Sequence, residues 1–419
     1  METTIRSVSL VILGAGLLAG GCATKNSVNW ESVKNPEVMA QLKSFVAEKE
    51  AQAKAAAETD GKGMPTDYEK FFSAAEKGDW PTISGMFWEM GKRNGAFENP
   101  GSSPDMTFRG SRWEAVREIW GAFDQFCEGD EKYSMAYGDD IIDSIPPGSI
   151  YFGGTDAGRF IVTAMVRSQV DADPFFVLTQ NQLLDATYLQ YLRSMYGEKI
   201  CIPTTNDLQK CIQDYTEDIE CRFKENKLKP GEEVKVLPGQ RVQISGRVAA
   251  MGVNALLAKI TFDKNTIREF YVEESFPLDW MYPYLEPHGL IFKLNRQPLS
   301  ELSDEIIRHD HDYWTNCIAP MIGDWLNDNT TIKEIAAFEE KVFARQDLSS
   351  FSGDPRFGRN EYWYATFSTE RCAIADLYAW RAEHAVSDSE KSGCSTRRIS
   401  RFARLGQCVH IRRERYIGM

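Results

Sequence analysis

The sequence is poor in positive charge and lacks several common signatures of catalytic and metal sites. Its 419 residues carry 48 Lys and Arg against 61 Asp and Glu, a formal net charge of −13. Nucleic-acid binding needs a basic face that neutralises phosphates, so no nucleic-acid partner is expected. With 42% apolar residues, the chain can still bury sizeable cores in two or three domains.

The absence of two motifs argues against two further classes of protein. No CxxC pair occurs among the nine cysteines, which argues against zinc, and no GxSxG nucleophile elbow occurs, which argues against a hydrolase. Neither a cofactor nor a metal is expected, and the chain is not predicted to be an enzyme. Cys201, Cys211 and Cys221 are ten residues apart, a spacing that does not share one helix face, so buried thiols are expected rather than disulfides.

The N-terminus carries the most specific pattern. Arg6 precedes an apolar run over residues 8–18, which is too short to span a membrane, and the run leads into Leu18-Ala19-Gly20-Gly21-Cys22. This resembles a bacterial lipoprotein signal, which implies cleavage before Cys22 and lipidation of that thiol. A plain secretory signal with a chance cysteine is the alternative. Both predict export, and the first predicts anchoring to the membrane surface at the periplasmic face of the cell envelope.

Hydrophobic periodicity divides the remaining chain. Residues 36–59 predict an amphipathic helix, and residues 67–77 and 80–92 predict a helical hairpin around Gly78-Asp79, similar to one tetratricopeptide unit. The predicted segments are a signal with lipobox at 1–22, a tether and helix at 23–65, a hairpin region at 66–130, an α/β domain at 131–298, a helical region at 299–390 and a basic tail at 391–419.

The central part predicts an α/β fold: a small, largely parallel sheet with covering helices, flanked by helical hairpins. Strands at 149–152, 175–179 and 200–202 alternate with helices at 156–167 and 183–196, the pattern of βαβ units. Further elements are predicted as helices at 113–127, 206–225, 241–263, 279–285, 301–328, 332–344 and 362–385 and strands at 268–272 and 290–295.

A glycine loop at Gly153, Gly154, Thr155 and Asp156 follows the first of these strands. Ligands bind at this position in open α/β sheets, and glycines with free helix-start N–H groups suit an anion. The loop is neither GxGxxG nor a P-loop, however, and Asp156 puts a negative charge where a phosphate would lie. The structural interpretation is that Thr155 or Asp156 caps the helix.

Three other polar patterns each allow a functional and a structural interpretation. Asn181 and Asp185 follow the second strand and predict either a sugar or polar-ligand site or a helix cap. His309 and Asp312 share a helix face, but no third metal ligand accompanies them, so a solvated face is favoured. Glu273 and Glu274 suggest the carboxylate pair of a glycosidase, yet neighbours on a strand point to opposite faces, which favours packing.

Residues 391–419 are basic and lack apolar periodicity. A membrane-facing tail is one interpretation. The favoured one is a frameshifted, truncated helical repeat, since a shifted frame can continue the preceding helical pattern. The nucleotide sequence of the gene decides between them.

Residues 139–183 and 271–296, the latter ending in a Gly289-to-Leu294 strand of the pattern GL.(Y/F)(R/K)L, resemble the extracytoplasmic α/β part of multi-spanning, glycosyltransferase-like membrane proteins of the protein O-mannosyltransferase class. The whole chain resembles exported bacterial proteins of unknown function with tetratricopeptide-like ends. The resemblance implies only the soluble accessory fold, because the membrane half that carries that class's catalytic acid is absent.

Taken together, the sequence predicts a non-catalytic binding or assembly module at the envelope. An envelope protein is the expected partner, and the lipid at Cys22 is expected to meet the membrane surface. The alternative is a protein that binds or acts on carbohydrates or phosphosugars, with a glycan partner, through Gly153, Gly154, Thr155 and Asp156 together with Asn181 and Asp185.

Overall fold

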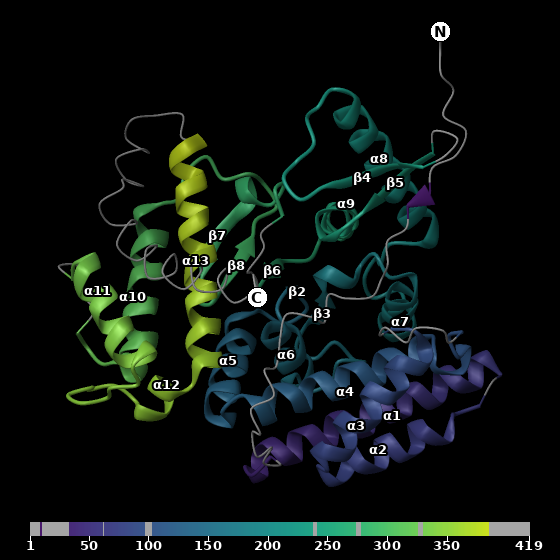
Figure 1. Ribbon diagram of the computed structural model, residues 1–419, viewed down its shortest axis with the longest axis horizontal. Helices are drawn as coiled ribbons and strands as arrows, with labels where there is room; N and C mark the ends of the chain where they lie inside the picture. The colour runs from purple at the N-terminus through teal and green to yellow at the C-terminus, as the bar shows by residue number, and fades with distance from the viewer. Residues whose placement is uncertain are drawn as a thin grey trace. The chain divides into compact units, whose positions relative to one another are not determined.

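The computed structural model describes residues 9–10, 33–61, 63–96, 103–237, 241–273, 278–325 and 330–384. The predicted signal with Cys22 and the basic tail at 391–419 therefore lie outside the described residues, apart from β1 (Ser9–Leu10), which pairs in parallel with β5 (Arg241–Ser245). The fold is mixed α/β and mainly helical (Figure 1).

The chain divides into two compact units, each built from separate stretches of sequence. Unit 1 comprises residues 1–123, 168–172 and 178–267, and unit 2 comprises residues 124–167, 173–177 and 268–419. Residues from the predicted α/β domain at 131–298 therefore contribute to both units. The predicted segment boundaries themselves stay predictions.

Unit 1 begins with a helical layer in which α1, α2 and α3 pack in succession. Its elements are α1 (Pro36–Asp60), α2 (Thr66–Lys77), α3 (Trp80–Asn94), η1 (Met106–Phe108), most of α4 (Ser111–Glu128), η3 (Gln180–Gln182), α7 (Ala186–Tyr196), α8 (Thr205–Lys224), β4 (Glu233–Leu237), β5 and α9 (Arg247–Lys264).

Local signals explain why the predicted hairpin forms. Gly78 takes a left-handed backbone conformation, with φ at 71°, which ends α2. The next residue, Asp79, accepts a hydrogen bond from the backbone N–H of Thr82 and so caps α3, whose second residue is Pro81. The predicted helices at 36–59, 67–77, 80–92 and 113–127 are confirmed.

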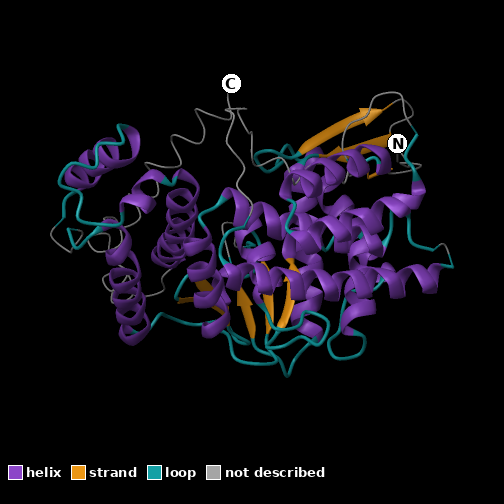
Figure 2. Cartoon of the chain, turned by 90° about the horizontal axis from the view of Figure 1, so that it is seen from below, coloured by secondary structure: helices purple, strands orange, loops and turns teal. Residues whose placement is uncertain are grey.

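Unit 2 holds most of a five-stranded sheet with the order β3-β2-β6-β8-β7, whose strands lie side by side (Figure 2). Its elements are α5 (Glu131–Ser144), β2 (Ile150–Gly153), η2 (Ala157–Ile161), α6 (Val162–Met165), the start of β3 (Phe176–Thr179), β6 (Phe270–Val272), η4 (Tyr282–Tyr284), β7 (Leu285–His288), β8 (Ile291–Leu294), α10 (Asp304–Ile322), α11 (Ile332–Glu339), η5 (Glu340–Ala344), α12 (Pro355–Arg359) and α13 (Glu361–His384).

The prediction of a largely parallel sheet was wrong for one half of the sheet. β2 pairs in parallel with β6, but β8 pairs antiparallel with both β6 and β7. The reason is a hairpin: β7 and β8 are joined through Gly289, whose φ is 66°, and so short a connection permits only antiparallel strands. The sheet is therefore mixed.

Several predicted elements also differ. The strand expected at 200–202 is absent, because the backbone N–H of Cys201 bonds the side chain of Asn265 instead of a strand. The helix expected at 279–285 is the shorter η4, and the opening of the helix expected at 241–263 is β5. The elements α5, β4, β7 and α12 were not predicted from the sequence.

Candidate functional site

The predicted glycine loop lies where it was expected, directly after β2. Gly153 ends that strand, Gly154 and Thr155 form the turn, and Asp156 precedes η2. The position matches the end of a sheet strand at which α/β proteins commonly bind ligands. The group that fills the loop, however, is a side chain of the same protein.

The carboxylate of Glu273 fills this loop. The residue follows β6 and has 0% of its surface exposed. Its Oε2 accepts hydrogen bonds from the backbone N–H groups of Gly154, at 2.5 Å, and Thr155, at 2.8 Å. Its Oε1 accepts from the Thr155 hydroxyl and, at 3.2 Å, from the Tyr137 hydroxyl on α5. An anion does bind the loop N–H groups, but that anion is a side chain.

The glycines of the loop make room for this contact. A Cβ added at Gly158 would lie 2.1 Å from Cδ of Glu273 and 2.2–2.5 Å from both of its carboxylate oxygens. A Cβ at Gly153 would lie 2.9 Å from Cα of Arg159 in the same turn. Close internal packing therefore explains both glycines.

Thr155 rather than Asp156 caps the turn that follows. The Thr155 hydroxyl accepts a hydrogen bond from the N–H of Gly158 at 3.0 Å, whereas Asp156 makes no capping bond. Asp156 instead pairs with the guanidinium of Arg159, which is buried and lies 4.2 Å from the centroid of the Phe160 ring. Of the two residues that the sequence offered as the cap, Thr155 makes the capping bond.

A second buried carboxylate belongs to the same network. The Tyr137 hydroxyl lies 3.3 Å from Oε1 of Glu370 on α13 as well as 3.2 Å from Glu273. Burial, reinforced by these two carboxylates, raises the pKa of Tyr137 well above its ordinary value, so the phenol keeps its proton. Since Glu370 is 1% exposed and Tyr137 0% exposed, this network joins α5, β6 and α13 without presenting a reactive group to solvent.

The other predicted site residues lie in unit 1, where they serve as caps and turn residues. Asp185 accepts from the N–H of Thr187 at 2.8 Å and caps α7. The fully buried side chain of Asn254 donates to the carbonyl of Asn181 and accepts from the N–H of Leu184. The structure thus places Asn181 and Asp185 in a different unit from Asp156 and gives both a local structural role.

Next to this turn is an acid that the sequence analysis missed. Glu114 on α4 is 1% exposed and pairs with Arg117, whose guanidinium also donates to the Gln182 side chain. Burial raises the pKa of Glu114 to about 7, the Arg117 charge opposes that rise, and the charge of Asp185 adds to it. A carboxyl that titrates near neutral pH is a feature of many functional sites, although this one is almost closed to solvent.

A lysine of unit 1 is fully buried. Nζ of Lys49 on α1 lies 2.7 Å from the carboxylate of Glu118 on α4 and 2.8 Å from the hydroxyl of Tyr191 on α7. It also donates to the side chain of Gln169, and it is 0% exposed. These contacts hold α1, α4 and α7 together. The sequence did not indicate that Lys49 is buried, because α1 also carries exposed charged residues.

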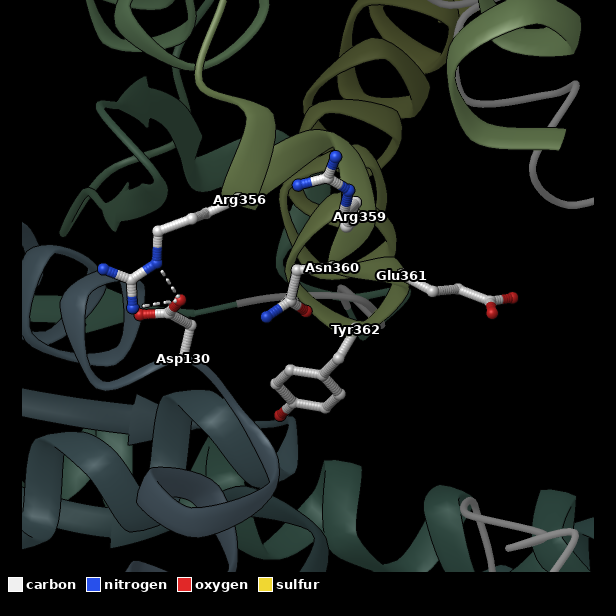
Figure 3. A pocket seen from close by; sticks show the side chains of 6 residues that line it. All are labelled: Asp130, Arg356, Arg359, Asn360, Glu361 and Tyr362. Carbon is white, nitrogen blue, oxygen red and sulfur yellow. Dashed lines mark hydrogen bonds and ion pairs between the residues drawn. The ribbon is translucent and has the colours of Figure 1, made fainter. Parts of the chain in front are cut away.

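A hollow in unit 2 has a volume of about 490 Å³ and is lined by Asp130, Arg356, Arg359, Asn360, Glu361 and Tyr362 (Figure 3). Arg356 points to Asp130, 2.6 Å away, whereas Glu361 points away from that pair. The lining charges do not converge on one point, and the two arginines are balanced by two acids. This hollow therefore has the character of a solvated polar surface.

Asp130 and Arg356, which line that hollow, belong to an interlocked pair of helix caps. Asp130 caps α5 and pairs with Arg356 at the start of α12, while Asp354 caps α12 and pairs with Lys132 at the start of α5. Although burial raises the pKa of Asp354, hydrogen bonds from Lys132 and Tyr133 outweigh that effect and hold the pKa at about 2. These two ion-paired caps connect segments that lie more than 200 residues apart in the sequence.

The histidine-rich stretch on α10 is only partly solvated. His309 and Asp312 are exposed, as predicted, but Asp310 between them is 5% exposed. Asp310 pairs with Arg371 at 3.0 Å and accepts from the Tyr378 hydroxyl at 3.0 Å. Within the described ranges, no group of three or more His, Cys, Asp or Glu residues is arranged to hold a metal ion.

The six cysteines in the described part of the chain form no disulfides. Of the three thiols expected to be buried, Cys211 is buried, Cys201 is half-buried and Cys221 is exposed, so the expectation is wrong for Cys221. No helix among the described residues is both long and apolar enough to cross a membrane.

Comparison with known proteins gave no match: neither a family model, nor a curated protein, nor a solved structure is similar to this chain.

Proposed function

We propose that the chain is an exported, lipid-anchored module that binds or assembles partner proteins at the bacterial cell envelope and is not an enzyme. The proposal that the chain is not an enzyme rests on the loop of residues 153–158, which is already occupied. Its N–H groups, the usual reason for a ligand to bind at the end of such a strand, already hold the carboxylate of Glu273, which is 0% exposed.

The partner-binding part rests on the helices. The helices α2 and α3 form a hairpin around Gly78 and Asp79, and the C-terminal helices α10 to α13 follow the sheet. Helical repeats bind other proteins through their concave faces, which gives such ends a plausible role. We include in this proposal that both helical ends are tetratricopeptide-like.

The anchoring part rests on the lipobox-like sequence that ends in Cys22. Cells that express the chain with Cys22→Ser should lose it from the membrane fraction, whereas the unchanged chain should remain there. Equal fractionation of both chains would remove lipidation from the proposal and leave plain export.

The competing function is binding of sugars or phosphosugars at the loop. A thermal-shift screen of the mature chain against sugars, sugar phosphates and nucleotides tests it, because a ligand that binds the native state must raise its stability. We expect no shift. A shift that Asp156→Ala abolishes would overturn the non-catalytic scaffold and favour the carbohydrate alternative.

A further inference from the structure

The loop around Glu273 has the properties of a complete carboxylate-binding site. Four groups donate to the two carboxylate oxygens: the backbone N–H groups of Gly154 and Thr155, the Thr155 hydroxyl and the Tyr137 hydroxyl. They come from the loop after β2 and from α5, whereas Glu273 follows β6. The donors are therefore placed independently of the acid that they bind.

The shape of the cradle matches a planar carboxylate. Without a side chain at Gly158, the space beside the turn is filled by Cδ, Oε1 and Oε2 of Glu273, all within 2.5 Å of where a Cβ would stand. Phosphate is tetrahedral and has five heavy atoms, so it does not match a space that is shaped by a planar carboxylate. Glu273→Ala would remove Cγ, Cδ and both oxygens, a fragment with the four heavy atoms of acetate.

We propose that the loop of residues 153–158 is a carboxylate-binding site whose ligand is supplied by the chain itself, and that free acetate binds there once the Glu273 side chain is shortened. The tether gives the internal carboxylate a high effective concentration, so the unchanged chain excludes external carboxylates. The inference concerns the recognition chemistry of the loop and stands apart from the proposed envelope function.

The test compares Glu273→Ala in sodium acetate and in sodium chloride of equal ionic strength. With a dissociation constant of about 10 mM, about 100 mM acetate should raise the ratio of folded to unfolded chains roughly tenfold. Amide exchange at Gly154 and Thr155 should slow in parallel, because their N–H groups regain an acceptor. The unchanged chain and Glu273→Gln, which keeps the space filled, should not respond, and neither should Glu273→Ala in phosphate.

Three results would overturn the proposal. One is an acetate effect no larger than that of chloride, and another is an equal effect on Glu273→Gln. The third concerns folding: if Glu273→Ala stays unfolded in about 0.5 M acetate while Glu273→Gln folds, the loop does not accept a free carboxylate.

The double variant Glu273→Ala, Thr155→Val tests whether acetate acts at the loop. Loss of the hydroxyl donor should weaken acetate binding about tenfold, since hydrogen bonds to charged groups are among the stronger ones. An undiminished acetate effect in the double variant would place the ion elsewhere and refute the site.

Discussion

The Gly158→Ala variant distinguishes two effects on stability, the close packing against Glu273 and the intrinsic preference of a helical backbone for alanine. Gly158 lies in η2 with helical backbone, where alanine is intrinsically favoured over glycine by about 1 kcal/mol. Its Cβ would nevertheless lie 2.1 Å from Cδ of Glu273, so the carboxylate must move by at least about 1.4 Å to reach an ordinary contact distance of about 3.5 Å. That shift breaks its bonds to Gly154 and Thr155 and leaves a buried charge poorly solvated.

The expected cost follows from those contacts. Hydrogen bonds to a charged group contribute about 1.5–3 kcal/mol each, and a buried charge that loses its partners costs about 3–5 kcal/mol. After the gain from helix preference, Gly158→Ala should destabilise unit 2 by about 2–4 kcal/mol. Gly85→Ala is the matched control: Gly85 lies in α3 with nothing within 4 Å of its added Cβ, and it should stabilise by about 0.5–1 kcal/mol.

Amide hydrogen exchange measures both effects, because it reports the opening free energy of each segment separately. A double-mutant cycle then identifies the cause. In a Glu273→Ala background the clash is gone, so Gly158→Ala should become neutral or stabilising. If Gly158→Ala costs the same with and without Glu273, the packing argument is wrong.

The remaining predictions concern single charged groups and the anchor. Burial raises the pKa of Glu114 from 4.5 to about 7, so between these values the native chain keeps a proton that the unfolded chain has lost. The free energy of unfolding should therefore fall as pH rises through that window, by at most about 1.4 kcal/mol per pH unit, and Glu114→Gln should flatten the slope in urea titrations. Equal slopes for both chains would contradict a protonated Glu114. Lys49→Met should cost about 3–5 kcal/mol by leaving Glu118 buried without its cation, whereas Lys43→Ala on the exposed side of α1 should cost less than about 0.5 kcal/mol. Similar losses from both would refute the role given to the buried pair. Globomycin should make the uncleaved precursor accumulate, and an unchanged precursor size would contradict lipidation at Cys22.

The N-terminal helices show what the sequence by itself determines. Asn35 caps α1, Gly78 ends α2 and Asp79 caps α3, and each of these signals acts within three residues of the helix end that it defines. The predicted ranges agree with the structure there because periodicity and capping are local. α5 had the same kind of signal, since Tyr133, Tyr137 and Ile141 form a stripe at helical spacing after the Asp130 cap, and it could have been found.

The occupant of the glycine loop was decided only by the tertiary structure. The sequence located the loop and offered two interpretations, an anion site and a capped turn. Glu273 lies 119 residues from Gly154, and only the parallel pairing of β2 with β6 brings its carboxylate to the loop. Local patterns specify which groups a segment offers, whereas strand pairing between distant segments decides which groups meet. That is why an apparent ligand site in the sequence is, in the folded chain, an internal contact.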